Sequence, residues 1–256
     1  QDFAFESIET QVDRSRAADT KALNAKHAFT ISAIVTDENE PYNQFLIYMA
    51  GTRGSITVHW GDGTSTNYPL GGTQFEVAKL YAAPGRYEIT VTGDIRNITF
   101  FQSSYGQGVF DNINFRPLTG LEGLRMSSLP GPEILDVSRA RNLQDLTPTD
   151  IKNLREIRLP HQHELWAVSI SGDTSLTSAT VNALINSVYQ NAVKKQRWGF
   201  FHLPKFPYDE TRSSEMVGPP SAASIAQLTE LQNKYGWEIV PEMPRPEEAA
   251  RSASGQ

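Results

Sequence analysis

Apolar residues recur every eleven positions between residues 121 and 170, and this spacing constrains the fold more than any other feature of the chain. Three columns of positions keep this period. The first column holds Leu121, Leu143, Leu154 and Leu165 and is interrupted by Pro132; the second holds Leu124, Leu135, Leu146, Ile157 and Val168; the third holds Met126, Val137, Pro148, Leu159 and Ile170. Short strands that point alternate residues inward and stack on one another produce such columns. The spacing therefore predicts a solenoid with about 22 residues per full turn.

The preceding region, residues 26–96, carries short β-branched runs separated by turn residues. The runs are AFTISAIVT, FLIYMAGT, GSITVHW, TSTNYP, FEVAKLY and RYEITVTG, with no helical segment between them. Closely spaced strands of this kind are typical of an all-β sandwich. We therefore expect one β-sandwich domain over this region.

A turn signal, WGDGT, ends one of these runs. By period-two alternation Trp60 shares a strand face with Ile56 and Val58 and enters the core, and Tyr87 points inward on a later strand. Gly61 and Gly63 supply backbone freedom on either side of Asp62, whose carboxylate can accept from nearby backbone N–H groups. We interpret Trp60, Gly61, Asp62, Gly63 and Tyr87 as a structural corner, because a lone carboxylate makes a poor calcium site.

WGDGT followed by YAAPGRYEITV resembles a polycystic kidney disease (PKD) type domain, which implies an immunoglobulin-like sandwich. EGLRMSS, EILDVSRARNLQDLT and NLREIRLP resemble short bacterial leucine-rich repeats. The succession of the two, ending in KYGWEI, resembles secreted surface proteins of Gram-negative gut bacteria. That resemblance implies an exported, cell-surface binding or adhesion protein.

The C-terminal third changes to a helical period. Two amphipathic helices are expected, with Thr177 or Ser178 capping the first and Gly236 ending the second. Their apolar positions are Val181, Leu184, Ile185, Val188, Tyr189 and Ala192, and then Ile225, Leu228, Leu231 and Tyr235. Strands RWGFFHLP and WEIV follow the first and the second helix, so residues 175–240 are expected to form a helix–strand cap on the solenoid.

The predicted fold is therefore mainly β with an α/β C-terminal part. It comprises an N-terminal arm (1–25), a PKD-like sandwich (26–96), a leucine-rich-repeat solenoid with a helical cap (97–240) and a disordered tail (241–256).

Composition excludes several function classes. The net charge of −6 without a dense basic patch argues against nucleic-acid binding. The absence of cysteine excludes thiolate catalysis, disulfides and zinc–thiolate sites, and no apolar run has the length of a membrane-spanning helix. Because the chain starts at Gln1, we expect a mature protein whose export signal has been removed, with membrane tethering only through a lipid anchor upstream.

LPHQHELW brings His161, His163 and Glu164 together in sequence, and His202 is a candidate third ligand. Both histidines would share one face of a strand, which suits a metal. The segment follows a strand of the eleven-residue pattern and lacks the HExxH spacing, so we interpret the pair as loop histidines and expect neither a metal nor another cofactor.

The run RWGFFHLPKFPYDE holds more aromatic residues than one strand needs, and these are the candidate ligand-binding residues. In it either Phe200 and His202 or Phe201 and Leu203 face the core, and the other pair faces outward. Flat aromatic rings beside polar groups suit a sugar ring or an aromatic peptide. The alternative is packing within the cap. The candidates are Trp198, Phe200, His202, Phe206 and Tyr208.

Catalytic motifs are missing from the sequence. There is no G-x-S-x-G or phosphate-binding loop, and Glu133 and Asp136 are better explained as solvated repeat residues than as a glycosidase pair. We expect a non-enzymatic binding or adhesion protein whose partner is a glycan or a protein at the cell surface. The alternatives are a carbohydrate-active enzyme or its accessory module, and a structural subunit of a surface complex.

Overall fold

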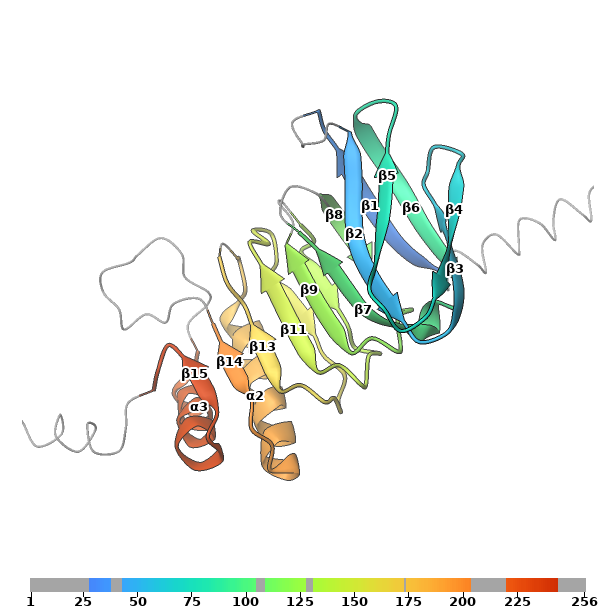
Figure 1. The fold of residues 1–256 in the computed structure, drawn as a ribbon. Helices are drawn as coiled ribbons and strands as arrows, with labels where there is room; N and C mark the ends of the chain where they lie inside the picture. Colours follow the sequence, from blue (N-terminus) through green and yellow to red (C-terminus); the bar gives the residue numbers. More distant parts are fainter. Residues whose placement is uncertain are drawn as a thin grey trace, which may run out of the picture.

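The computed structural model describes residues 28–37, 43–104, 109–127, 131–172, 174–203 and 220–243. The protein is mainly β: 42% of the described residues lie in strands and 19% in helices (Figure 1). The expected N-terminal arm and residues 244–256 of the expected tail lie outside the described residues.

One sheet is formed by strands from the first half of the chain. Its order is β4-β3-β6-β1-β8, and neighbouring strands are antiparallel. The strands are β1 (Phe29–Val35), β3 (Gly54–His59), β4 (Ser65–Leu70), β6 (Gly85–Gly93) and β8 (Phe110–Asn114). A short 3-10 helix, η1 (Ile95–Asn97), follows β6.

A second, eight-stranded sheet runs through most of the molecule in the order β15-β14-β13-β11-β9-β7-β2-β5. Its strands are β2 (Gln44–Gly51), β5 (Phe75–Leu80), β7 (Ile98–Ser103), β9 (Gly123–Ser127), β11 (Asp145–Thr149), β13 (Ala167–Ser169), β14 (Phe200–His202) and β15 (Glu238–Val240). The pairs β5–β2 and β2–β7 are antiparallel, whereas every pair from β7 to β15 is parallel, so the sheet is mixed.

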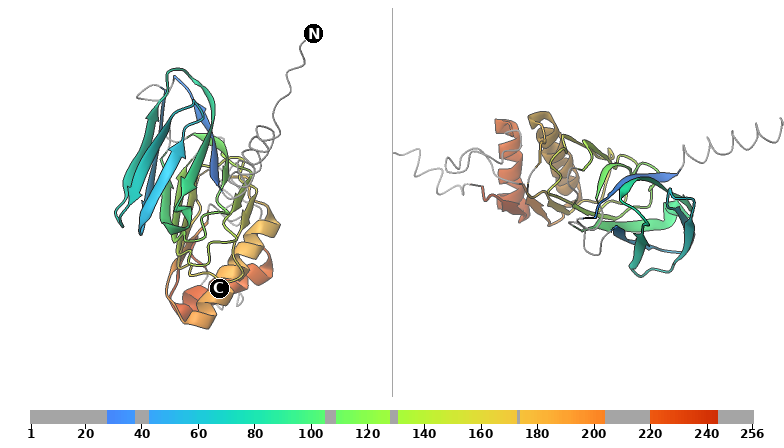
Figure 2. Two further views of the ribbon diagram at one scale, coloured as in Figure 1. Left: turned by 90° about the vertical axis from the view of Figure 1, so that its right-hand side faces the viewer. Right: turned by 90° about the horizontal axis from the view of Figure 1, so that it is seen from above.

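A third sheet has two parallel strands, β10 (Ile134–Asp136) and β12 (Glu156–Arg158). Helices α2 (Ser178–Lys195) and α3 (Ala222–Tyr235) lie side by side against the β13–β15 end of the large sheet (Figures 1 and 2). The Thr177 hydroxyl accepts from the Thr180 N–H and caps α2, and Gly236 ends α3 in the left-handed conformation at φ 69°.

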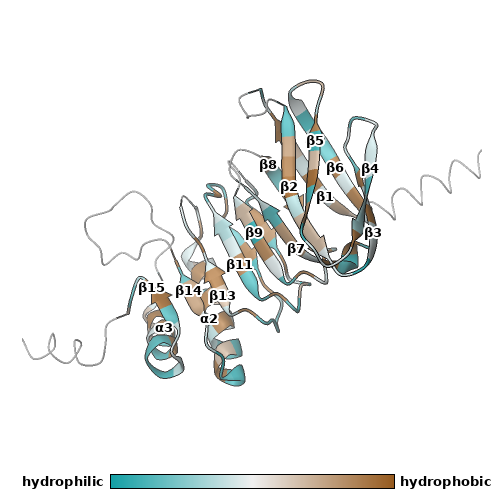
Figure 3. Cartoon of the chain, viewed as in Figure 1, coloured by the Kyte–Doolittle hydropathy of each residue, from teal (hydrophilic) through white to brown (hydrophobic). Residues whose placement is uncertain are grey.

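The buried apolar residues form one continuous core cluster from Phe29 to Met243. Hydrophobic residues recur along the strands of both halves and on the inner sides of the helices (Figure 3). One buried row crosses the parallel part of the large sheet in register, one residue per strand: Phe101, Leu124, Leu146, Val168, Phe201 and Ile239. From β9 to β13 each step is 22 residues, since Gly123 pairs with Asp145 and Asp145 with Ala167.

The predicted succession of a sandwich and a leucine-rich-repeat solenoid is wrong. Strands β2 and β5, both from the expected sandwich, belong to the same sheet as β9, β11, β13, β14 and β15, because β7 pairs with β2 on one side and with β9 on the other. The strands of residues 97–240 do not form a uniform array either. In the layer formed by β10 and β12, the next element among the described residues is helix α2 and not a third strand.

The predicted helical cap is also wrong. The edge of the large sheet is a strand, β15, and no helix lies across it among the described residues. Helix α2 instead buries an apolar stripe against the inner side of the sheet, and α3 packs beside it. The helical period in the sequence located both helices but carried no information about which surface they cover.

Substituting Leu146 by alanine should lower the free energy of unfolding by about 3 kcal/mol, because a side chain with 0% exposure leaves a cavity in the central row. Leu80→Ala is the matched control: its side chain is 67% exposed, and it should cost less than about 1 kcal/mol. Urea titration followed by tryptophan fluorescence measures both. Equal losses in the two variants would contradict the assignment of the core.

Candidate functional site

Four aromatic side chains, Trp166, Trp198, Phe200 and His202, form a cluster on the outer face of the large sheet. The Trp166 and Trp198 ring centroids lie 6.4 Å apart at an interplanar angle of 28°. The Phe200 ring stands edge-on to the Trp166 ring, with centroids 6.0 Å apart, and its centroid lies 5.0 Å from that of the His202 ring. We call these four residues the aromatic cluster.

Strand β14 sets this orientation. Phe201 and Leu203 point into the core, with exposures of 0% and 4%, so Phe200 and His202 face outward. The structure thus selects the second of the two pairings that the sequence left open. Trp198, directly before the strand, keeps 56% of its surface exposed.

Gly199 allows the close approach that builds the cluster. A Cβ at this position would lie 2.3 Å from the Trp166 carbonyl oxygen and 2.7 Å from the Trp237 ring. Trp237 is buried, and its Nε1 donates to the Arg197 carbonyl oxygen at 2.7 Å. The Phe200 N–H donates to the Trp166 carbonyl oxygen at 2.8 Å, which fixes both aromatic residues through the backbone.

Polar groups adjoin the cluster on the same face. His202 Nε2 lies 3.0 Å from the carboxylate of Glu238, which is 61% exposed. Asp145 lies in register with Ala167 and Phe200, and therefore on the same face. Its carboxylate binds Arg125 through Nε at 2.8 Å and accepts from the Thr147 hydroxyl at 2.8 Å. The face thus offers flat apolar rings at one end and paired charges at the other.

Sequence reasoning missed one member of the cluster and proposed two residues that cannot be placed. Trp166 directly follows Leu165, a buried position of the eleven-residue pattern. A tryptophan beside such a position is the feature of the sequence that could have indicated an aromatic residue on the outer face. Phe206 and Tyr208 lie outside the described residues.

The WGDGT turn engages Asp62 fully. Asp62 Oδ1 accepts from the Thr64 backbone N–H at 2.9 Å and from the Thr64 hydroxyl at 2.6 Å, and Lys79 Nζ lies 2.9 Å from Oδ2. The Thr64 hydroxyl and then the Lys79 ammonium lower the pKa of Asp62 to about 2. Gly61 and Gly63 have φ values of 77° and 86°, which favour glycine. This is the geometry of an Asx-turn reinforced by an ion pair.

The aromatic residues of the turn region tie it to the core. Trp60 is 1% exposed and donates from Nε1 to the Thr66 hydroxyl at 2.9 Å. Its carbonyl oxygen accepts from the Tyr81 hydroxyl at 2.8 Å, and burial raises the pKa of that hydroxyl. Tyr87 stacks on Tyr81 with centroids 3.8 Å apart and donates to the Ala83 carbonyl oxygen at 2.9 Å. Trp60 and Tyr87 therefore stabilise the corner.

His161 and His163 do not come together. His161 is exposed, whereas His163 is 1% exposed, accepts at Nδ1 from the Leu165 N–H at 3.2 Å and lies 2.9 Å from the Ser187 hydroxyl through Nε2. These contacts fit a neutral ring protonated at Nε2. Burial, with a smaller effect of the Lys195 charge, lowers the pKa of His163 to about 4.

The remaining acidic candidates are held in ion pairs, accept hydrogen bonds or line a groove. Glu164 binds Lys195 and Arg197, and Asp136 accepts from the backbone and hydroxyl of Ser138. Glu133 lines a groove beside α2. Within the described ranges no group of three or more His, Asp or Glu side chains is placed to hold a metal ion.

Comparisons with protein-family models, curated proteins and solved structures find no match. The resemblance of residues 26–96 to a PKD-type domain therefore stays a prediction. Neither described helix is both long and apolar enough to cross a membrane.

Asp62→Asn should lower the melting temperature at pH 6, because the amide cannot pair with Lys79. The pKa of Asp62 is depressed from 3.8 to about 2, so its contribution is present above pH 4 and is lost as the pH falls towards 2. The difference in melting temperature between wild type and variant should therefore vanish between pH 4 and 2. Glu76→Gln, on the same strand as Lys79, is the control, and a pH-independent difference for Asp62→Asn would contradict the assignment.

His163→Gln should make the protein less sensitive to acid. The pKa of His163 is depressed from 6.5 to about 4, so the neutral ring stabilises the fold above pH 6.5 and this stability is lost as the pH falls through 4. The loss is on the order of 3 kcal/mol. Thermal melts from pH 7 to 4 should flatten for His163→Gln but not for His161→Gln, an exposed control two residues away. Identical profiles would argue that His163 protonates freely in the fold.

Proposed function

We propose that this protein is a non-enzymatic binding protein whose aromatic cluster contacts a glycan. The observation that carries the proposal is Trp198, a tryptophan with 56% of its surface exposed and stacked beside Trp166. An exposed indole held by packed neighbours gives a rigid surface of large area at little cost in side-chain entropy.

The geometry suits a pyranose ring. The nearly parallel Trp166 and Trp198 rings offer flat surface to the C–H face of a sugar, and the edge-on Phe200 adds a side wall. The His202–Glu238 pair adjoins the rings and supplies hydrogen-bond partners for hydroxyl groups. These polar groups would fix the orientation of a ring whose binding energy comes from stacking.

A protein ligand is the second candidate, favoured by Val240. This residue is 43% exposed on the edge strand β15, in register with His202, so apolar surface continues from the cluster to the edge of the sheet. Aromatic residues surrounded by polar groups are also typical anchors of protein interfaces.

Export to the cell surface is part of the same proposal. It rests on the resemblance of the sequence to secreted surface proteins and on the suitability of a glycan as a partner outside the cell. Tethering through an upstream lipid anchor fits this location.

Trp198→Ala should weaken glycan binding about tenfold or more, because the variant removes one of the two stacking surfaces while leaving the buried residues of β14 in place. A glycan array identifies the ligand, and titration calorimetry of the best hit measures the change. Trp166→Ala should act in the same direction, and Leu80→Ala, an exposed apolar residue on the opposite edge strand β5, should have no effect.

Other outcomes would overturn the proposal. Release of reducing sugar from the array ligands would indicate a carbohydrate-active enzyme. Absence of glycan binding together with stable co-purification of one protein that Trp198→Ala releases would establish the protein-ligand alternative. Co-purification that Trp198→Ala leaves unchanged would indicate a structural subunit.

A further inference from the structure

The two-stranded sheet ends early beside α2. Strands β10 and β12 pair in parallel, with Leu135 opposite Ile157, and no other strand of the described residues pairs with β12. On the opposite side of the core the large sheet continues past β11 with β13, β14 and β15. Within the described residues, the two-stranded sheet therefore has a free edge at β12, at the level where the large sheet continues with further strands.

The chain itself begins a third strand at this edge and then leaves it. The Ser175 N–H donates to the Leu154 carbonyl oxygen at 3.0 Å, and the Thr177 N–H donates to the Arg155 carbonyl oxygen at 3.3 Å. At Ser178 the chain turns into α2. Among the described residues, no extended segment continues along the edge beside Ile157.

Hydrogen bonding shows which groups are free. The Glu156 N–H donates to the Glu133 carbonyl oxygen and the Val137 N–H donates to the Arg158 carbonyl oxygen, so Glu156 and Arg158 direct their backbone groups to β10. Alternation along a parallel strand then directs the N–H and C=O of Ile157 to the other side. Neither group has a hydrogen-bond partner in the part of the chain that the structure describes.

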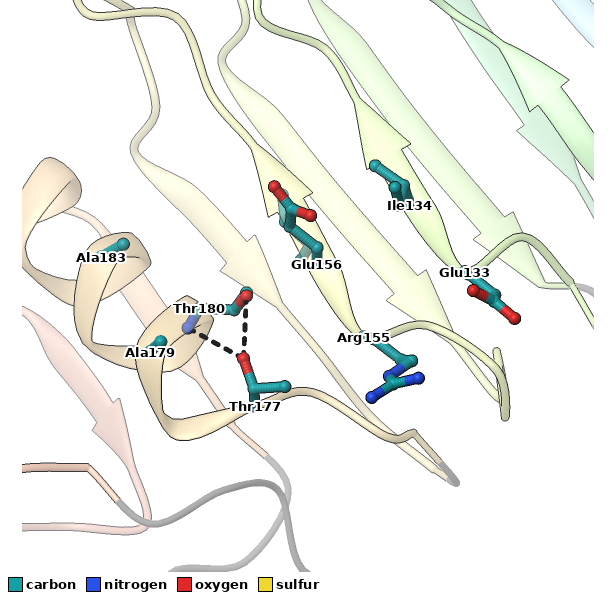
Figure 4. Close-up of a pocket in the computed structure, with 9 residues that line it drawn as sticks. Glu133, Ile134, Arg155, Glu156, Thr177, Ala179, Thr180 and Ala183 are labelled. Atoms are coloured by element: carbon teal, nitrogen blue, oxygen red, sulfur yellow. Dashed lines mark hydrogen bonds between the residues drawn. The ribbon is translucent and has the colours of Figure 1, made fainter.

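A groove lies between this edge and α2. One cavity of about 570 Å³ is lined by Ile134, Ile157, Ala179 and Ala183, and it shares Ile157 and Ala183 with a second cavity of about 290 Å³ that extends towards Gln190. Figure 4 shows the small side chains of α2 across the groove from the strands, with Glu133 and Arg155 at one end. Ala179 and Ala183 are the small side chains that α2 contributes to the lining of the groove.

We propose that this groove binds an extended peptide segment of a partner protein, which adds as a third strand to β12. The segment would pair with the free N–H and C=O of Ile157 and continue the line that residues 175–177 begin. An aliphatic side chain on the segment would point inward beside Ile157, and a polar one would point outward beside Glu156 and Arg158.

Other occupants fit less well. An apolar small molecule would leave the main-chain groups of Ile157 unpaired, which costs free energy when they are covered. A second copy of β12 would have to bring its own α2 into the same groove, because that helix flanks the edge in each copy. The peptide site lies apart from the aromatic cluster and does not depend on the proposed glycan binding.

A phage library of random linear octapeptides, selected against the full chain, provides the probe. Selected peptides should show alternating polar and aliphatic residues, and Ala183→Trp should weaken their binding at least about tenfold by filling the groove. Ala226→Trp, the same substitution at an exposed position of α3, should leave binding unchanged. Trp198→Ala should also leave it unchanged.

A second measurement tests the backbone pairing directly. In ¹⁵N-labelled protein the Ile157 amide should shift and exchange its hydrogen more slowly when peptide is added. N-methylation of the peptide at alternate residues should abolish binding in one register. Failure to enrich any peptide, equal binding by Ala183→Trp, or an unchanged Ile157 amide would overturn the proposal. A dimer in sedimentation that Ala183→Trp dissociates would show instead that a second copy occupies the groove.

Discussion

The pairing of β7 with two different kinds of neighbour determines how this chain is organised. Phe101 lies opposite Met49 in the antiparallel pair with β2 and opposite Leu124 in the parallel pair with β9. Its buried ring also packs against Phe29, Phe110 and Phe115, with centroids 5.0–6.5 Å away. Hydrogen bonds and packing thus pass through one strand from the N-terminal hairpins to the C-terminal strands, so neither half completes its core alone.

The same register determines what the surface displays. Successive residues of a strand face opposite sides, so the in-register row from Phe101 to Ile239 leaves the residues on either side of it for the outer face. A slip of one residue in β14 would bury Phe200 and expose Phe201. Gly199 prevents that slip, since only a residue without a side chain fits between the Trp166 carbonyl oxygen and the Trp237 ring.

The strands and helices were predictable from local pattern, but their assembly was not. Alternation places β1 within the run 28–36, and the helical period with Thr177 and Gly236 gives α2 and α3 near their observed ends. Sheet membership depends on which strand edges meet, and nothing in the sequence of β7, ITFFQS at 98–103, indicates that this strand pairs on both sides. The eleven-residue columns mark buried positions such as Leu124 and Leu135, and the structure places these two residues in different sheets. The columns do not indicate where the two-stranded sheet stops.

The candidate site shows the same limit. Excess aromatic residues around β14 are visible in sequence, yet Trp166 joins them only because β13 and β14 are neighbours in space. His163 resembles its exposed neighbour His161 in sequence, and only the packing of α2 over it explains why one is buried and neutral. Long-range contacts decide both cases, and local pattern does not encode them.

The position of α2 accounts for both candidate surfaces. The inner sides of β13 and β14 carry apolar residues such as Val168 and Phe201. These belong to the same buried core cluster as the apolar residues of α2: Val181, Leu184, Ile185 and Val188. A helix in this place cannot satisfy the backbone edge of β12, because its own N–H and C=O groups are used internally. No described helix covers the aromatic cluster on the outer face of the large sheet, because α2 and α3 pack on the inner side, where burial of apolar surface stabilises the fold.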